Sequence, residues 1–235
     1  MTVQIENGTY AEHLTVNKQI TLTAKTGHAP VIDGSDSQTP AITVTAAATL
    51  RGLTINGAHA LGAGTHFQEV NVLASAALTV ENCTIANFAH CGIKANKALT
   101  VRNTTIHTGG DNTLDHCIYI AAGNVGAHTI ENCEFYGATG WGVHLYSYEY
   151  NATVTGCNIH DNYGGVLVTG EGHTITNNTI TDNTGGNGVD FFHYGLTNLT
   201  VTGNTLSGNS AYDLFLDGTF GTGNTISGNT GTKNF

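Results

Sequence analysis

The stretch LTVENCTIAN, residues 78–87, decides the fold because close copies of it recur down the rest of the chain. The further copies are LTVRNTTIHT from Leu99, HTIENCEFYG from His128, ATVTGCNIHD from Ala152, HTITNNTITD from His173, LTVTGNTLSG from Leu199 and the shorter GTGNTISG from Gly221. Each copy holds two short strand-forming runs joined by an Asn-centred turn, and a third apolar run, such as CGIKA at residues 91–95, follows it. Three short strands per repeat predict a solenoid, in which each coil buries its apolar side chains by stacking on its neighbours.

Composition and repeat length agree with this prediction. The 235 residues include 31 Gly but only 2 Pro, and Thr and Asn are frequent, which suits tight turns between β-branched strands. We therefore expect an all-β, right-handed parallel β-helix solenoid of about nine coils, with residues 1–235 forming a single domain or a module of a longer chain. Asn82, Asn103, Asn132 and Asn177 recur at one turn position, where Asn tolerates the left-handed backbone and stacked amides can hydrogen-bond along the axis.

Strand alternation predicts which side chains of the third strand in each coil point into the solenoid. The expected inward column is Ile93, Ile118, Val143, Val166, Val189 and Leu214. The expected outward column is Thr43, Asn71, Lys94, Tyr119, His144, Leu167, Asp190 and Phe215. On the other two faces the outward positions are mostly Thr. The third face is therefore the candidate functional face, because only there do we expect Lys, Tyr, His, Asp and Trp to gather.

Eleven residues on or beside this face are candidates for a site. The candidate catalytic residues are Lys94, His116, Tyr119 and His144. The candidate substrate-binding residues are Trp141, Tyr146, Tyr148, Tyr150, Asp190, His193 and Tyr194. Each also has an ordinary structural explanation: Lys94 as a solubilising charge, Tyr119 as a strand residue, and the aromatic cluster as packing of a loop over the sheet. Their expected convergence on neighbouring coils favours a site.

Two stretches resemble known families. GTYAEHLTVNKQITLTA from Gly8, followed by VIDG from Val31, resembles the opening coils of the pectate-lyase-like β-helix superfamily, many members of which are polysaccharide lyases, epimerases or hydrolases. GWGVHLY from Gly140 resembles the Tyr-Gly-Phe-Asp-Pro-His strand of bacterial mannuronan C5-epimerases, with the residue types permuted. Trp141 stands in the place of that Tyr, His144 in the place of the Asp, and Tyr146 in the place of the His. The paired aspartates of the polygalacturonase branch are not seen.

The resemblance implies an enzyme of acidic polysaccharides such as alginate or pectate. Uronate lyases and C5-epimerases both begin by removing the proton α to the carboxylate, which requires charge compensation, a base and a proton donor. Lys94, or a Ca²⁺ ion held by Asp190, would offset the carboxylate. His144 is expected to have a pKa suited to a base near neutrality, and Tyr119, one coil away at about 4.8 Å, would be donor or second base. No cofactor other than Ca²⁺ is expected.

Charge and hydropathy restrict the partners. The formal net charge is −10, with 7 Lys and Arg against 17 acidic residues, so the basic stripe of a nucleic-acid-binding protein is missing. No apolar run is long enough to span a membrane. The same acidity opposes tight binding of a polyanion unless a divalent cation bridges the two. We expect a monomer that is secreted or extracellular on the analogy of its fold, although the chain shows no signal peptide.

Two other functions remain open at this stage. A non-catalytic carbohydrate-binding, adhesin or tail-spike module would use the same aromatic residues without a matched acid and base. An ice-binding solenoid would need paired Thr-x-Thr within its strands, and the expected strands show this pattern only at Thr43–Thr45. The segments 107–115, 147–151 and 193–198 are expected to wall a cleft over the candidate face between Lys94 and Asp190.

Overall fold

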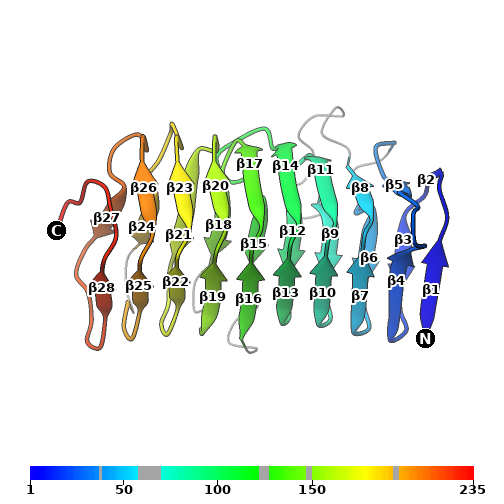
Figure 1. Ribbon diagram of the computed structural model, residues 1–235, viewed down its shortest axis with the longest axis horizontal. Coiled ribbons are helices and arrows are strands. Elements are labelled where there is room, and N and C mark those ends of the chain that lie inside the picture. Colours follow the sequence, from blue (N-terminus) through cyan, green and yellow to red (C-terminus); the bar gives the residue numbers. More distant parts are fainter. Residues whose placement is uncertain (37–38, 58–69, 122–126, 147–149, 193–195) are drawn as a thin grey trace.

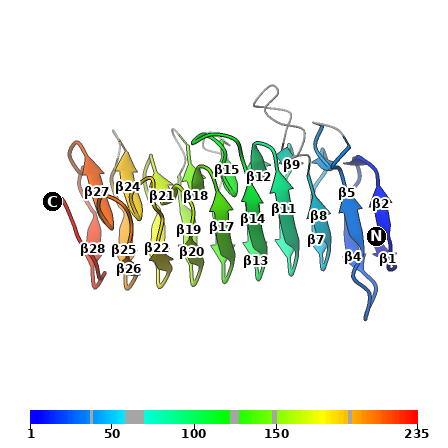
Figure 2. The same ribbon diagram turned by 90° about the horizontal axis from the view of Figure 1, so that it is seen from above.

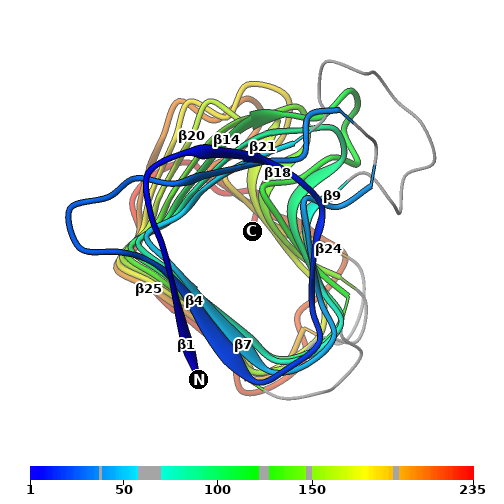
Figure 3. The same cartoon turned by 90° about the vertical axis from the view of Figure 1, so that its right-hand side faces the viewer.

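The computed structural model describes residues 1–235 apart from 37–38, 58–69, 122–126, 147–149 and 193–195. The described part is an all-β, right-handed parallel solenoid with the N- and C-termini at opposite ends of its long axis (Figure 1). Seen along that axis, successive coils superpose around a common interior (Figure 3). Strands occur as nine consecutive triplets, β1 to β27, followed by β28, so the expected count of about nine coils agrees closely with the structure.

All the strands lie in three parallel sheets, which run side by side along the long axis (Figure 2). Sheet A holds β1 (Thr2–Ile5), β4 (Ile20–Ala24), β7 (Ala48–Arg51), β10 (Leu78–Glu81), β13 (Leu99–Arg102), β16 (His128–Glu131), β19 (Ala152–Thr155), β22 (Thr174–Thr176), β25 (Thr200–Thr202) and β28 (Thr225–Ser227). Sheet B holds β2 (Thr9–Ala11), β5 (Val31–Asp33), β8 (Thr54–Asn56), β11 (Thr84–Phe88), β14 (Thr105–Gly109), β17 (Glu134–Ala138), β20 (Asn158–His160), β23 (Thr179–Thr181) and β26 (Thr205–Ser207). Sheet C holds β3 (Leu14–Val16), β6 (Ile42–Val44), β9 (Val70–Ala74), β12 (Cys91–Ala95), β15 (Ile118–Ile120), β18 (Trp141–Leu145), β21 (Gly164–Val168), β24 (Val189–Phe192) and β27 (Leu214–Asp217).

The predicted inward column of sheet C is confirmed. Ile93 pairs with Ile118, and the in-register pairing continues through Val143, Val166, Val189 and Leu214. All six side chains have zero exposed surface and belong to one hydrophobic core, to which all three sheets contribute. Because side chains alternate along a strand, the residues between these positions lie on the outer side of sheet C.

One member of the predicted outward column is wrong. Lys94 pairs with Leu73, which in turn pairs with Thr43, so Leu73 and not Asn71 occupies that position on β9. Asn71 is buried, and its side-chain amide donates a hydrogen bond to the carbonyl oxygen of Ala86 (2.6 Å). Leu73 takes the outward position because it lies between Val72 and Ala74, the inward residues of the strand.

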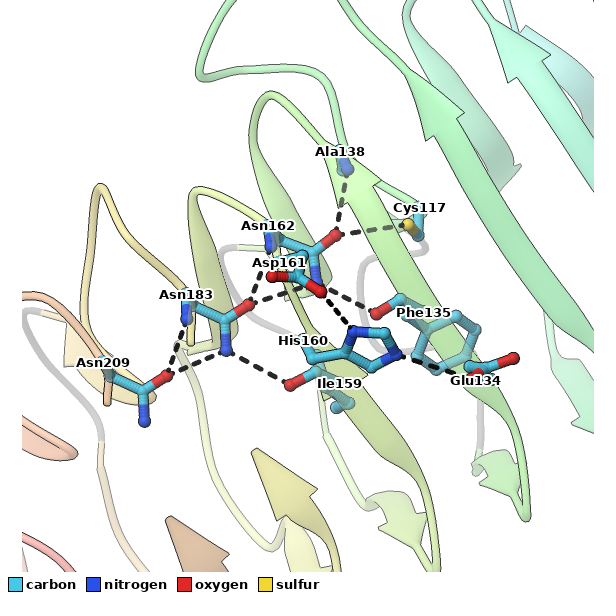
Figure 4. A network of polar contacts seen from close by, with 10 residues as sticks. All are labelled: Cys117, Glu134, Phe135, Ala138, Ile159, His160, Asp161, Asn162, Asn183 and Asn209. Atoms are coloured by element: carbon cyan, nitrogen blue, oxygen red, sulfur yellow. Dashed lines mark hydrogen bonds and ion pairs between the residues drawn. The ribbon is translucent and has the colours of Figure 1, made fainter. Parts of the chain in front are cut away.

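The turn asparagines adopt the left-handed backbone that their spacing predicted. Asn82, Asn103, Asn132 and Asn177 have φ values of 53°, 47°, 54° and 56°. The long amide ladders that the structure shows are formed by other asparagines. One links Asn162, Asn183 and Asn209 in a different turn (Figure 4), and a second links Asn178, Asn204 and Asn229 at the next position of the same turn.

Candidate functional site

Three of the four candidate catalytic residues lie side by side on adjacent strands of sheet C. Lys94 on β12 pairs with Tyr119 on β15, which pairs with His144 on β18. Neighbouring strands are about 4.8 Å apart, so the three side chains start from one short line across the sheet. The register required for a shared site is therefore present.

These side chains are more buried than strand alternation alone suggested. Lys94 is 8% exposed and His144 is 9% exposed, and both strands that carry them are buried on both faces. Tyr119 is half-buried. The expectation of an exposed His144 is therefore wrong, and the candidate residues form a recessed cluster instead of an open surface.

His116 joins this cluster through hydrogen bonds. The residue precedes β15 and is 2% exposed. The backbone N–H of Trp141 donates to His116 Nδ1 (3.0 Å), and His116 Nε2 lies 2.9 Å from His144 Nδ1. The two imidazole rings meet edge to face, with their centroids 4.6 Å apart and their planes at 89°.

Burial keeps both imidazoles neutral at ordinary pH. It lowers the pKa of His144 from 6.5 to about 4. It also lowers the pKa of His116 well below 6.5, and proximity to His144 and His90 acts in the same direction. The expected near-neutral pKa of His144 is therefore wrong, because removing the ring from water disfavours its charged form.

Aromatic rings surround His144. The centroids of Tyr119 and Tyr146 lie 5.1 Å and 5.5 Å from that of His144, and 5.5 Å from each other. Tyr146 is 47% exposed, so this ring has open surface on which a sugar could stack. Lys94 Nζ lies 5.7 Å from the Tyr119 ring centroid, and burial lowers the pKa of the lysine.

The other candidate binding residues differ in how much of each ring is exposed and in whether the structure describes them. Trp141 is 8% exposed, because it packs edge to face on Tyr163 and lies directly over Gly164. Little of its ring is left for a sugar. Tyr150 is half-buried and its backbone bridges to Glu171. Three further candidates, Tyr148, His193 and Tyr194, lie outside the described residues.

Asp190 belongs to a separate part of the face. Leu167 lies between it and His144 in the register, as the sequence predicted. Asp190 is 8% exposed, and Asn187 donates a hydrogen bond to its Oδ2 (2.8 Å). Within the described residues no three His, Cys, Asp or Glu side chains gather in a way that could hold a metal ion. A Ca²⁺ ion at Asp190 would therefore need ligands beyond that set, such as substrate oxygens.

Sequence reasoning missed a buried Asp–His pair next to the cluster. His90 Nδ1 contacts Asp115 Oδ1, and Asp115 Oδ2 accepts hydrogen bonds from the backbone N–H groups of Asp111 (2.6 Å) and Asn112 (2.9 Å). His90 is 5% exposed and Asp115 1%. A signal existed, since a His-Cys pair stands at the start of the third strand in two successive coils, at residues 90–91 and 116–117.

Sheet B also carries side chains that the sequence analysis overlooked. His107, Tyr136 and His160 stack with nearly parallel rings, with centroid distances of 4.8 Å and 5.2 Å. His160 is hydrogen-bonded to Asp161 (Nδ1 to Oδ2, 2.8 Å). The expectation that only sheet C gathers titratable and aromatic residues is therefore wrong.

Sheet A carries more paired threonines than the sequence analysis counted. Thr-x-Thr occurs on the adjacent strands β19, β22 and β25, and the pairs lie in register. Thr155 and Thr176 share a hydrogen bond between their hydroxyl groups (3.1 Å). A scarcity of such pairs therefore does not count against an ice-binding face.

Only some of the segments that were predicted to wall a cleft belong to the described residues. Residues 110–115 form a turn closed by Asp115, whereas 147–149 and 193–195 are outside the described residues. A hollow of about 490 Å³ lies elsewhere, over sheet A near the N-terminal end. Ile20, Ala48, Leu78 and Thr79 line it among others. Because its lining is mostly Ala, Ile, Leu and Thr, it offers no acid–base chemistry.

The pKa shift of His144 predicts how stability depends on pH. The folded-state pKa is about 4 and the unfolded value 6.5, so between these values the unfolded chain binds more protons. The free energy of unfolding should therefore fall as the pH drops from 6.5 to 4, by on the order of 3 kcal/mol for this group. Urea unfolding at several pH values checks this, with His144→Gln as control. Parallel pH curves for the two proteins would contradict it.

Comparison with known proteins shows which folds this chain is similar to. A family model described as right-handed β-helix region matches residues 32–148 and 110–235. The crystal structure of pectate lyase Pel9A has a TM-score of 0.70 and 15% identity, covering 97% of this chain and 69% of that chain. ORF18 of Geobacillus virus E2 has a TM-score of 0.62 and 12% identity, covering 92% of this chain and 53% of that chain. The A-module of the Azotobacter vinelandii mannuronan C-5 epimerase AlgE6 has a TM-score of 0.51 and 17% identity, covering 100% of this chain and 87% of that chain.

At these identities the three structures show a shared fold and no more. No curated protein sequence matches the chain. In the part of the chain that the structure describes, no helix has both the length and the apolar character to cross a membrane.

Proposed function

The chain belongs to the right-handed β-helix family, and from this premise we propose that it acts on a uronic-acid polysaccharide by removing the C5 proton of a sugar unit. The observation that carries the proposal is the recessed, in-register line of Lys94, Tyr119 and His144. Two structural neighbours, a pectate lyase and a mannuronan C-5 epimerase, are named for activities on acidic polysaccharides. We propose β-elimination as the outcome, with C5-epimerisation, which shares its first step, as the alternative.

The residues supply what this first step needs. Removing the proton next to a carboxylate places further negative charge on that group, which a nearby cation or hydrogen-bond donor stabilises. Lys94 is buried and its pKa is lowered, so an anionic sugar carboxylate would offset the cost of keeping it charged. Tyr119 carries the proton chemistry with His144 beside it, and the exposed ring of Tyr146 holds the sugar chain.

A neutral His144 fits this site in spite of its low pKa. A neutral imidazole still carries one N–H donor and one acceptor nitrogen. Such a ring can polarise a carboxylate without becoming a cation, and its low pKa keeps it in that form at working pH. The Tyr119 oxygen, ionised for this step, then accepts the proton that leaves C5. In β-elimination the bond from C4 to the glycosidic oxygen breaks, and that oxygen takes the same proton from Tyr119.

The runner-up is a non-catalytic carbohydrate-binding module. It is supported by Tyr146, the most exposed candidate ring among the described residues, and by the net charge of −10, which opposes tight binding of a polyanion. The virus protein among the structural neighbours shares the fold as well. A module of this kind would bind a glycan but release no product.

Secretion and a monomeric state complete the proposal. We propose that the protein is secreted, on the analogy of its fold, and that it acts as a single solenoid. Light scattering of the purified protein measures the mass directly, and a stable dimer would remove the monomer from the proposal.

A substrate panel tests the activity. Alginate, pectate and a glucuronan should be compared with a neutral glycan, with and without chelator, and the unsaturated product of β-elimination followed by ultraviolet absorbance. We expect product from at least one uronate and none from the neutral glycan, because without a carboxylate nothing acidifies the C5 proton. Proton NMR of the polymer detects epimerisation in the same samples. If no uronate is cleaved or epimerised, the binding-module interpretation replaces the enzyme.

A further inference from the structure

The hydrogen bonds around His116 fix where its proton lies. The backbone N–H of Trp141 points at His116 Nδ1 (3.0 Å), and a backbone N–H can only donate. Nδ1 must therefore be the acceptor nitrogen of that ring. Because burial keeps His116 neutral, its single proton is on Nε2.

The same reasoning passes to His144. His116 Nε2 lies 2.9 Å from His144 Nδ1, and since Nε2 carries the proton, it is the donor and His144 Nδ1 the acceptor. A neutral His144 then carries its own proton on Nε2. Among the described residues no hydrogen bond to His144 Nε2 is formed, so this N–H is available to a ligand.

We propose that His116 is a positioning residue that locks His144 into the Nε2–H tautomer, so that His144 donates a hydrogen bond to the carboxylate of a bound uronate and does not act as a base. The inference rests on the proposed function for the identity of that ligand. For His144 to accept a proton at Nε2, its own proton would have to move to Nδ1, facing the Nε2–H of His116. This clash is relieved only if the His116 proton moves from Nε2 to Nδ1, where it would face the backbone N–H of Trp141.

The consequence is a division of roles within the site. The His144 N–H and the Lys94 ammonium both meet the substrate carboxylate, on which charge builds as the C5 proton leaves. His144 keeps its proton throughout, so no imidazolate is formed. The base is then left to Tyr119, which lies on the strand between Lys94 and His144.

The direct test is NMR of protein labelled with ¹⁵N in its histidines. Protonated and unprotonated ring nitrogens have well-separated ¹⁵N shifts. The wild-type protein should show His116 and His144 both in the Nε2–H form between pH 6 and 8, and assignment follows from the signal lost in each single variant. Detection of His144 in the Nδ1–H form, or as an imidazolium in this pH range, would overturn the proposal whether or not the protein is an enzyme.

Two substitutions of His116 separate positioning from mere packing. His116→Leu removes the donor to His144, whereas the amide of His116→Gln can still donate to His144 Nδ1. We expect His116→Leu to lower kcat at least tenfold with mixed tautomers at His144, and His116→Gln to recover most of that loss together with the single tautomer. His160→Gln, on sheet B, is the control for a histidine outside the cluster. Equal kcat and equal spectra in all three variants would show that His116 does not position His144. If no uronate is turned over, the proposed enzymatic function is rejected. The wild-type ¹⁵N spectrum still tests the proposed tautomer of His144.

Discussion

Tyr119→Phe should lower the turnover of a polyuronate at least about a hundredfold, because a general acid or base contributes roughly 10²–10⁴ to the rate. The substitution removes one oxygen and keeps the ring, which lies 5.1 Å from His144 and 5.5 Å from Tyr146 by centroids. Steady-state rates on the uronate found active in the substrate panel give the measurement. The loss should appear in kcat, since Lys94 and Tyr146 still hold the chain.

Stability and a matched variant control this experiment. The free energy of unfolding should change by no more than about 1.5 kcal/mol, the net value of one hydrogen bond. Tyr136→Phe makes the same chemical change on sheet B, where Tyr136 stacks between His107 and His160, and should leave kcat unaltered. If Tyr119→Phe retains activity within a factor of three, Tyr119 carries no proton and the base must lie elsewhere.

The sequence predicted the fold and its register because each rests on a strict local pattern. A strand that buries one face tolerates no one-residue slip, so the alternation around Val143 and Val166 specified which side chains enter the core. The error at Asn71 arose beside a long insertion, residues 58–69, where the repeat no longer fixes the alignment of β9.

Burial and hydrogen bonding at the site could not be predicted in the same way. Whether the outer side of sheet C is covered depends on how loops fold back, and no period in the sequence encodes this. His144 was therefore assigned an ordinary pKa, although the structure lowers it to about 4. The link from Trp141 through His116 to His144 joins two neighbouring coils, because Trp141 and His144 lie on β18 and His116 precedes β15, and only the stacked coils bring those atoms together.

Asn183→Ala should be the most destabilising of the substitutions considered, by about 2–4 kcal/mol, because buried partners left without hydrogen bonds each cost about 1–3 kcal/mol. Asn183 has zero exposed surface. Its Oδ1 accepts from the backbone N–H (3.1 Å) and the side-chain amide (3.2 Å) of Asn162, and its Nδ2 donates to Ile159 O (3.2 Å) and Asn209 Oδ1 (2.9 Å) (Figure 4). Alanine keeps the backbone but removes all four bonds.

The ladder also reaches the candidate site, so this substitution should affect function as well as stability. Asn162 Oδ1 accepts a hydrogen bond from the backbone N–H of Ala138 (3.0 Å), at the end of the strand before Trp141, and a longer one from Cys117 Sγ (3.9 Å), next to His116 (Figure 4). Asn162 loses its own anchor when Asn183 is truncated. Urea unfolding measures the stability, and the ¹⁵N spectrum of His116 reports the turn. Asn158→Ala, an exposed asparagine on β20, is the matched control and should stay within about 0.5 kcal/mol of wild type. Equal stability of the two variants would mean that the amide ladder adds nothing to the coil stack, and that the turns holding His116 and Trp141 are fixed by the strands alone.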